Sequence, residues 1–343
     1  MKSSMYKSKI LYFGNDLSKR TGYVTAMDIL AEKLQAEGIE LYRSSNKRNR
    51  WIRMVDMIKV FFLHAIPSDY ILIDTFSTVN FWYAFAISQL ARMFRKKYIP
   101  ILHGGNLPRR LDRNPHLSRM IFKNSYANVA PSGYLKHEFE KRGYRTEFIP
   151  NILDISQYPY KERHPVRPRL LYVRAFAKHY NPGLAVEVLK KLKQKYPEAQ
   201  LCMVGPDKDG TLARVKQLTA HYGLSDSVLF TGVLPKPEWH KLSEDYDIFI
   251  NTTNVDNTPV SVMEAMALGL PVVSTNAGGL PYLIENGKDG ILVEPNNPDA
   301  FATAVEALIE NPAKAVSLSH NARRKAESFD WNEVREKWMN LLK

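Results

Sequence analysis

Residues 251–283 read NTTNVDNTPVSVMEAMALGLPVVSTNAGGLPYL, and this stretch decides which fold the chain is predicted to have. An apolar strand is expected over 248–250, and it leads into an acidic loop rich in Asn and Thr. A helix follows, and a second apolar strand is expected over 271–274. This order of strand, helix and strand is typical of a parallel sheet with crossover helices.

The start of the predicted helix suits an anion. Thr258 is expected to be the N-cap and Pro259 the first helical residue, because these residue types are favoured there. The backbone N–H groups of Val260 and Ser261 then face the loop, where they can bind phosphate.

Two carboxylates, Asp256 and Glu264, flank the same helix start and are separated by seven residues. Carboxylates accept hydrogen bonds from sugar hydroxyls, whereas backbone amides bind phosphate, so the combination suits a nucleotide-sugar. The same acids also suit a purely structural role as charges near a helix N-terminus, with Gly269 as the residue that ends the helix.

The stretch resembles the donor-site signature of the retaining glycosyltransferases of family 4, within the glycosyl transferases group 1, which have the GT-B fold. That signature has two acids separated by seven residues, then E-A-M-A-x-G-x-P-V-V and a Gly-Gly pair. This chain has Asp256-x7-Glu264, the run EAMALGLPVV over 264–273, and Gly278-Gly279. Its first acid is Asp where the family more often has Glu. The resemblance implies an α/β protein with two Rossmann-like domains that face each other across a cleft.

Composition agrees with two globular domains, because the 343 residues are 45% hydrophobic and 24% charged. The net charge of +13 lies entirely in the first half of the chain. Residues 1–165 contain 27 Lys and Arg against 14 Asp and Glu, while residues 166–343 contain 21 of each. This asymmetry predicts an acidic partner for the first half, such as a membrane surface, a phosphorylated acceptor or a nucleic acid.

Cysteine use and hydropathy predict the compartment. The single cysteine, Cys202, lies in the apolar run LCMVG and is expected to be buried, and one cysteine cannot build a disulfide framework. No run approaches the ~18 apolar residues of a membrane span. The apolar stretch ILYF before Gly14 is too short for a signal peptide. We therefore expect a cytoplasmic protein.

Strands and helices are expected to alternate along both halves of the chain. In the first half the strands are predicted near 9–13, 39–43, 70–74, 98–103, 126–131 and 146–149, and the helices near 22–37, 50–65, 78–96, 117–124 and 133–142. In the second half the strands are predicted near 169–174, 200–204, 228–231, 248–251, 271–274 and 291–293, and the helices near 182–195, 210–222, 236–244, 259–268, 279–285 and 298–310.

Residues 151–168 contain three prolines without clear periodicity and are expected to link the domains. The predicted domains are an acceptor-side domain over 1–160 and a donor-binding domain over 161–328. Residues 329–343 are expected to form a final helix. The resemblance implies that this helix crosses back to the first domain, and packing on its own domain is the alternative.

Two cations follow the first strand of the predicted donor domain. The resemblance implies that Arg174 binds the donor diphosphate and stabilises it as it leaves, because negative charge builds up there in the transition state. Lys178 is the candidate for the second cation. It lies four residues after Arg174, whereas the family usually has its Lys at five and follows it with Gly, and a solvent-exposed lysine is the alternative.

The resemblance also divides the remaining roles. Glu264 is expected to accept both ribose hydroxyls, and Asp256 to hold the hydroxyls of the transferred sugar rather than attack it. Thr258, Pro259 and Val260 are expected to line the sugar and the phosphates. The family's usual mechanism is a front-face transfer in which the leaving phosphate oxygen accepts the acceptor's proton, so no protein base is required.

In the first half, His103 ends a predicted strand and precedes Gly104-Gly105. The resemblance implies that His103 contacts the donor sugar, and a structural histidine is the alternative. Gly14, after the first strand, matches one residue of a family Gly-Gly pair near the phosphates. Arg109 and Arg110 are candidates for contacting an anionic acceptor or belong to a solvated loop.

Metal is not expected in the reaction. Asp207-x-Asp209 and Asp245-x-Asp247 are the pairs of a type that binds Mg²⁺ or Mn²⁺ in the metal-dependent GT-A transferases. The first precedes a predicted helix, where Asp caps are common, and the second lies between a helix and a strand. We predict a metal-independent enzyme without a cofactor.

Residues 47–63, KRNRWIRMVDMIKVFFL, mix cations with apolar side chains that cover one broad helical face. Trp beside Arg suits a lipid headgroup region, so we expect peripheral association with an anionic membrane, on its inner face. An ordinary helix packed on the sheet is the alternative. A nucleic-acid-binding protein would use the same charge, but the sequence has no zinc finger, RNA-recognition signature or basic aromatic repeat.

These observations predict a retaining glycosyltransferase that moves a hexose from a nucleotide-diphosphate sugar to a hydroxyl group. The acceptor is expected to be a saccharide or a lipid-linked intermediate in the synthesis of a cell-surface polysaccharide or glycolipid. The alternative is another GT-B enzyme, of the phosphorylase or hydrolase type, that transfers the sugar to phosphate or water.

Overall fold

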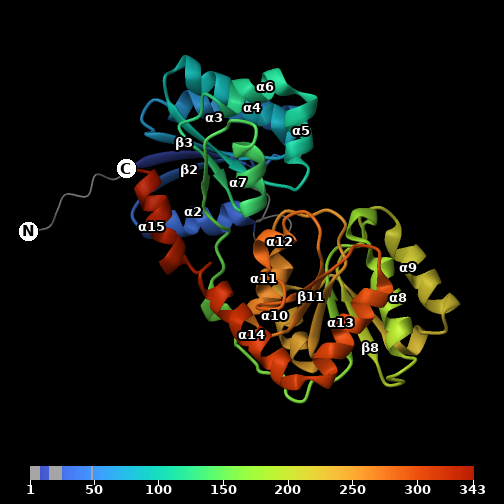
Figure 1. Cartoon of the computed structure of the whole chain (residues 1–343). Coiled ribbons are helices and arrows are strands. Elements are labelled where there is room, and N and C mark those ends of the chain that lie inside the picture. The colour runs from blue at the N-terminus through green and yellow to red at the C-terminus, as the bar shows by residue number, and fades with distance from the viewer. Residues whose placement is uncertain (1–7, 15–24, 48) are drawn as a thin grey trace, which may run out of the picture. The chain divides into compact units, whose positions relative to one another are not determined.

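The computed structural model describes residues 8–14, 25–47 and 49–343, which divide into two compact units (Figure 1). Unit 1 consists of Met1–Ile152 and Trp331–Lys343, and unit 2 of Leu153–Asp330. The sequence analysis placed these boundaries at 160/161 and 328/329. Each unit is a parallel sheet covered by helices on both faces, which is the Rossmann-like architecture that the sequence predicts.

The sheet of unit 1 has six parallel strands in the order β2-β1-β3-β4-β5-β6. Their bounds are β1 Lys9–Phe13, β2 Glu40–Ser44, β3 Tyr70–Thr75, β4 Lys97–Leu102, β5 Asn128–Ala130 and β6 Thr146–Phe148. All six residues of β3, YILIDT, are buried, as expected for a central strand of a parallel sheet with both faces covered. The register pairs Leu11 with Ile71 and Ile73 with Pro100, so the carboxyl ends of β1, β3 and β4 lie together.

Helices cover both faces of this sheet. They are α2 Ala26–Ala36, α3 Arg50–His64, α4 Asn80–Met93, α5 Leu107–Arg113, α6 Pro115–Phe122 and α7 Gly133–Glu140. Helix α2 contributes Leu30 and Leu34 to a core on one face, while α3 and α4 contribute Phe61 and Ala84 to a separate core on the other. The helix expected over 22–37 is described only from Ala26, since residues 22–24 lie outside the described residues.

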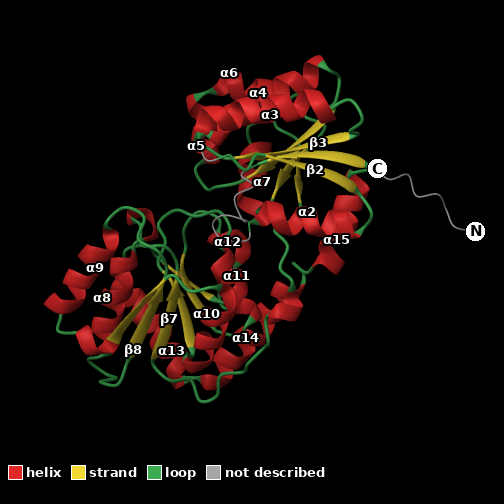
Figure 2. Ribbon diagram, turned by 180° about the vertical axis from the view of Figure 1, so that it is seen from behind, coloured by secondary structure: helices red, strands yellow, loops and turns green. Residues whose placement is uncertain are grey.

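The final helix, α15 (Trp331–Leu341), packs within unit 1 next to α2, as both views show (Figures 1 and 2). Trp331 and Trp338 are buried in the same core as Leu30. The indole Nε1 of Trp331 donates a hydrogen bond of 3.2 Å to Glu37, and Arg335 forms an ion pair with the same carboxylate at 2.7 Å. These contacts make α15 part of the α2 layer although it follows unit 2 in the chain.

The sheet of unit 2 also has six parallel strands, in the order β12-β11-β10-β7-β8-β9. Their bounds are β7 Arg169–Val173, β8 Gln200–Val204, β9 Val228–Gly232, β10 Ile248–Asn251, β11 Val272–Thr275 and β12 Ile291–Val293. The helices are α8 Pro182–Leu192, α9 Thr211–His221, α10 Lys236–Leu242, α11 Val260–Ala267, α12 Leu280–Leu283, α13 Pro298–Glu310 and α14 Pro312–Glu327. Short 3-10 turns are η1 Ile155–Gln157, η2 Lys178–Tyr180, η3 Ser225–Ser227 and η4 Ser243–Asp245.

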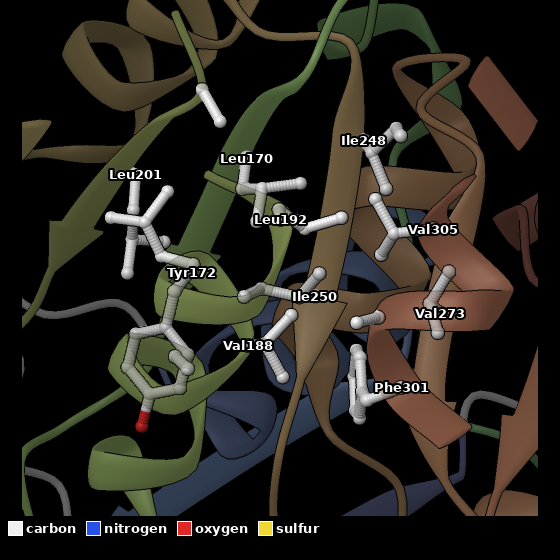
Figure 3. Close-up of a cluster of buried hydrophobic side chains, with 14 of the residues drawn as sticks. Leu170, Tyr172, Val188, Leu192, Leu201, Ile248, Ile250, Val273, Phe301 and Val305 are labelled. Atoms are coloured by element: carbon white, nitrogen blue, oxygen red, sulfur yellow. The ribbon is translucent and has the colours of Figure 1, made fainter. Parts of the chain in front are cut away.

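Two apolar layers hold unit 2 together. On one face of the sheet, α8 and α13 pack on β7 and β10 through side chains that are drawn in Figure 3. On the other face, α10, α11 and α12 form a second core, in which Cys202 is fully buried as predicted. Each fully buried aliphatic side chain contributes roughly 1.5–3 kcal/mol. This packing fixes β7 and β10, whose ends carry the residues of interest.

Two helices were not predicted. The segment around Arg109 and Arg110, for which a solvated loop was one alternative, is helix α5. Asn114 separates it from α6, whose first residue is Pro115, in agreement with the preference of Pro for the first helical turn. Helix α14 begins at Pro312, where the side chain of Asn311 accepts the N–H of Lys314. Within the described residues, no helix is both long enough and apolar enough to cross a membrane.

Candidate functional site

The loop after β10 and the first residue after β7 meet at one edge of the sheet of unit 2. Strands β7 and β10 are parallel neighbours, so their carboxyl ends point the same way. Arg174 follows β7, and Asp256 lies in the loop between β10 and α11. The Arg174 guanidinium donates a hydrogen bond to the Asp256 carboxylate, and both side chains are largely buried. The structure therefore brings together two residues that the sequence analysis selected separately.

The surroundings of this pair hold it in place. The other carboxylate oxygen of Asp256 accepts the N–H of Asn257 at 2.8 Å. The Arg174 guanidinium lies over the ring of Tyr180, 4.3 Å from its centre. The Nε atom of Arg174 is buried without a hydrogen-bond partner among the described residues. The cation thus retains a donor that a bound anion could use.

The Gly278-Gly279 pair fixes the Asp256 loop through close backbone contact. A Cβ atom at Gly279 would lie 1.7 Å from the carbonyl oxygen of Asn257, and one at Gly278 would lie 2.2 Å from that of Asp256. The Gly279 N–H donates to the Asp256 carbonyl at 3.0 Å. Only glycines permit this approach, so the pair positions the loop that carries the acid.

The start of α11 differs from the prediction in one respect. The helix begins at Val260 with Pro259 as the N-cap, because the ψ angle of Pro259 is extended at 116°, and Thr258 forms no capping bond. The prediction of Thr258 as the N-cap is therefore wrong by one residue. The hydroxyl oxygens of Thr258 and Ser261 are instead buried without a hydrogen-bond partner among the described residues. Buried polar groups of this kind call for a ligand or water.

Glu264 is 4% exposed and makes contacts that the sequence analysis missed. Its Oε1 accepts the hydroxyl of Tyr158 at 2.9 Å and forms an ion pair with Lys236 at 2.6 Å. Both contacts end on Oε1, so Oε2 remains available for a ligand. Burial, followed by the nearby Glu264 carboxylate, raises the pKa of Tyr158 far above its ordinary value, so its hydroxyl stays a donor.

His240 packs against Tyr158, with 4.7 Å between the ring centres. Burial, together with the charge of Lys236, lowers the pKa of His240 to about 4. The imidazole is therefore neutral at physiological pH. Its Nε2 atom is buried without a hydrogen-bond partner among the described residues.

Lys178 does not join this group of residues. It begins the turn η2 and is exposed, and its backbone N–H donates to Asp209 at 3.0 Å. Its ammonium has no hydrogen bond or ion pair within the described ranges. Besides Arg174, Lys236 is a cation that contacts an expected site residue, Glu264. Lys236 lies on α10, and its distance from Glu264 in the sequence gives no indication of this contact.

In unit 1, His103 and Gly14 meet around Asp74 at the ends of β1, β3 and β4. His103 Nε2 lies 3.0 Å from Asp74 Oδ1, which also accepts the Tyr12 hydroxyl at 2.9 Å. A Cβ atom at Gly14 would lie 2.5 Å from the other Asp74 oxygen, so a larger residue would displace the carboxylate. The ring of Phe76 stacks on His103 with 4.9 Å between the ring centres. Asp74, a polar residue in a buried strand, was not selected from the sequence.

Arg109 and Arg110 lie on α5, so the alternative of a solvated loop is wrong. The Arg110 guanidinium packs over the rings of Phe81 and Trp82, at 4.5 and 5.6 Å from their centres, whereas Arg109 is exposed. Any role of these two arginines toward an acceptor stays a prediction.

Asp207, Asp209 and Asp247, three of the four residues in the aspartate pairs, have structural partners. Asp207 and Asp209 accept backbone N–H groups at the start of α9, and Asp247 forms an ion pair with Arg167 at 2.7 Å. Among the residues that the structure describes, no group of three or more His, Cys, Asp or Glu side chains is arranged to hold a metal ion. Independence from metal stays a prediction.

Comparison with solved structures identifies the fold. Sucrose-phosphate synthase from Thermosynechococcus elongatus is similar with a TM-score of 0.81 and 17% identity, over 97% of this chain and 98% of that one. The Anabaena protein Alr3699/HepE, solved in complex with UDP-glucose, has a TM-score of 0.75 and 18% identity over 97% and 99%. The two Rossmann-like units therefore form the GT-B fold, as predicted.

The sequence comparisons identify the family. The family model described as glycosyl transferases group 1 matches residues 157–325. This region therefore belongs to the group 1 glycosyltransferases, and the resemblance seen in the sequence is confirmed at this level. It contains Arg174, Asp256 and Glu264.

The curated relatives of this chain include a glycosyltransferase. The amylovoran biosynthesis glycosyltransferase AmsK of Erwinia amylovora is 28% identical over 268 residues, which is 73% of this chain and 65% of that protein. Spore coat protein SA of Bacillus subtilis is 30% identical over 180 residues, 50% of this chain and 47% of that protein. The chain thus spans about half to two thirds of the length of these two relatives.

Proposed function

We propose that this protein is a retaining glycosyltransferase that moves a hexose from a nucleotide-diphosphate sugar to a hydroxyl group. The observation that carries the proposal is the Arg174–Asp256 pair at the edge of the sheet, next to the first turn of α11. That turn has the buried, unpartnered hydroxyls of Thr258 and Ser261, and the same helix carries the buried carboxylate of Glu264. Cation, helix N-terminus and carboxylates are the groups that a sugar nucleotide needs.

The nucleotide end of the donor is assigned to Glu264. Tyr158 and Lys236 orient this buried carboxylate through Oε1, so Oε2 can accept hydrogen bonds from ribose hydroxyls. The structurally similar HepE was solved with UDP-glucose bound, which supports a uridine nucleotide as the first to test.

The diphosphate is assigned to Arg174 and the start of α11. The Arg174 guanidinium donates a hydrogen bond to the Asp256 carboxylate. We infer that a donor separates them: the diphosphate takes the guanidinium, and the sugar hydroxyls take the carboxylate. The first-turn N–H groups of α11 then add to the positive potential around the phosphates.

Transfer breaks the bond between the anomeric carbon and the phosphate oxygen and forms a bond to the acceptor oxygen on the same face. The proton of the acceptor hydroxyl passes to the leaving phosphate oxygen, so atoms and charges balance without a protein base. Arg174 stabilises the negative charge that grows on the diphosphate. In unit 1, Asp74 engages Nε2 of His103, so Nδ1 is the atom that His103 would offer to a hydroxyl.

The acceptor is proposed to be a saccharide or lipid-linked intermediate of a cell-surface polysaccharide or glycolipid. The relative AmsK is a glycosyltransferase of amylovoran biosynthesis, and this supports the first class. The reaction is proposed to need no metal and to take place at a membrane surface, with the protein bound peripherally.

A panel of nucleotide sugars tests the proposal. One nucleotide sugar should raise the melting temperature of the protein. NMR of the product should show that the anomeric configuration of the donor is retained. Transfer should continue in the presence of a metal chelator. Glu264→Gln and Arg174→Ala should lose the donor-induced shift, whereas Glu238→Gln, on the exposed first turn of α10, should keep it. If no donor gives a shift or transfer, the proposal is wrong, and release of free sugar or sugar phosphate would favour the hydrolase or phosphorylase alternative.

A further inference from the structure

The outer face of α3 carries large apolar side chains that are exposed. Six residues from the start of α3 to just beyond its end are between 53% and 82% exposed. They are Trp51, Ile52, Val55, Phe62, Leu63 and Ile66. Positions 52, 55, 59 and 62 follow one another in steps of three and four, so they form one stripe about 15 Å long, and Ile66 follows just beyond the end of the helix. Lys59 is the charged member of the stripe.

These residues are not needed for the core. Met57 and Phe61, which are 1% and 0% exposed, pack from α3 into the core of unit 1. A helix that only packed on its sheet would place its remaining positions in water and fill them with polar residues. Helix α3 is instead apolar on two sides, and the outer side has no covering element in the described chain.

The stripe continues onto the end of α4. The ring of Phe62 packs edge-on against Phe94, with 5.7 Å between the centres. Phe94 is 38% exposed and its neighbour Met93 is 67% exposed. We call these two residues and the six exposed apolar residues at α3 the α3 face. Helices α3, α4 and α6 lie on the same side of the sheet of unit 1 (Figures 1 and 2).

Cations line a depression next to the part of the α3 face that lies at the end of α4. A depression of about 460 Å³ between α4 and α6 is lined by six residues, none of them acidic. They are Arg92, His116, Arg119, Met120, Lys123 and Asn124. Residues 75–137, which include α4 and α6, contain 10 Lys and Arg and a single acid, Asp112. That carboxylate is already paired with Arg142 at 2.9 Å.

We propose that the α3 face binds the surface of an anionic lipid bilayer. The apolar stripe would enter the boundary between headgroups and acyl chains, with Trp51 near its edge, as interfacial helices do. The depression lined by Arg92, Arg119 and Lys123 would bind lipid phosphates, because charge complementarity selects an anionic surface. This binding is independent of the donor site, and it would bring the proposed enzyme to a lipid-linked acceptor.

Vesicle flotation with the full chain tests the inference. The protein should float with phosphatidylcholine vesicles that contain phosphatidylglycerol at low salt, less at high salt, and not with phosphatidylcholine alone. Trp51→Ser with Phe62→Ser should remove binding, whereas Leu229→Ser, which changes a leucine that is 50% exposed in unit 2, should not. Arg119→Gln with Lys123→Gln should weaken binding by about fivefold per cation. The matched control is Lys208→Gln with Lys241→Gln, on exposed lysines of unit 2.

Thermal melts show that each variant is folded. Absence of wild-type binding to anionic vesicles at low salt overturns the inference, and so does equal binding by the stripe variant. Concentration-dependent self-association that the stripe variant abolishes, without vesicle binding, would assign the α3 face to contacts between copies. Because donor-induced thermal shifts are measured without vesicles, failure here leaves the proposed transferase activity standing.

Discussion

Gly279→Ala tests whether the glycine pair holds the Asp256 loop. The added Cβ would lie 1.7 Å from the carbonyl oxygen of Asn257 and 2.6 Å from its carbon, while ordinary contact begins at 3.4 Å. Both atoms belong to the backbone, so the loop itself has to move. The φ angle of Gly279 is −86°, which any residue adopts, so steric overlap is the only penalty.

The expected cost of this substitution is about 1–3 kcal/mol, the usual range for overpacking. Displacement of the loop should also separate Asp256 from Arg174, so the stabilisation by a nucleotide sugar should disappear. Urea unfolding measures the first effect, and melting curves with the donor measure the second.

Gly183→Ala is the matched control, since its Cβ would meet the nearest atom, in Leu218, at an ordinary 3.6 Å. Gly183 lies in the first turn of α8, where Ala is a better helix former, so this variant should be more stable by about 0.4–1 kcal/mol. Gly279→Ala with unchanged unfolding and an unchanged donor shift would refute the role given to the glycine pair.

Three further predictions concern stability. The pKa of His240 is about 4 in the folded protein and 6.5 in the unfolded chain, so the unfolded chain binds more protons between pH 4 and pH 6.5. The free energy of unfolding should therefore fall as the pH is lowered from 6.5 toward 4. His240→Phe should flatten that dependence in urea titrations. Lys236→Met should cost about 1 kcal/mol because its partner Glu264 is buried, whereas Lys288→Met, in a pair exposed on both sides, should cost clearly less; equal losses in urea unfolding would contradict this reasoning. Trp338→Ala should cost about 3–5 kcal/mol, since Trp338 is 3% exposed; a loss below about 1 kcal/mol would contradict the placement of α15.

Much of the fold could be predicted because buried strands and amphipathic helices have strong patterns. Apolar runs such as YILID and LCMV locate β3 and β8 to within a residue or two. Helix α5 was missed because LPRRLDR is short and basic. Helix α14 was missed because its core residues, such as Ala315 and Ala322, are small and give a weak apolar period.

The candidate site was predictable only where it is local in sequence. Asp256, Glu264 and the glycine pair lie within one short stretch, so a signature can contain them. Tyr158 reaches Glu264 from 106 residues away, and Lys236 approaches it from another helix. Contacts of this kind follow from chain topology, which no spacing rule encodes. The N-cap of α11 was predicted one residue too early, at Thr258, because the ψ angle of Pro259 decides where the helix begins.

The position of α15 has a consequence for the order of synthesis on the ribosome. Unit 2 interrupts unit 1 in the chain, because residues 153–330 emerge before Trp331. While they emerge, Leu30 and Ile10 lack the two indoles that later cover them. Unit 1 thus lacks part of this core until translation reaches α15.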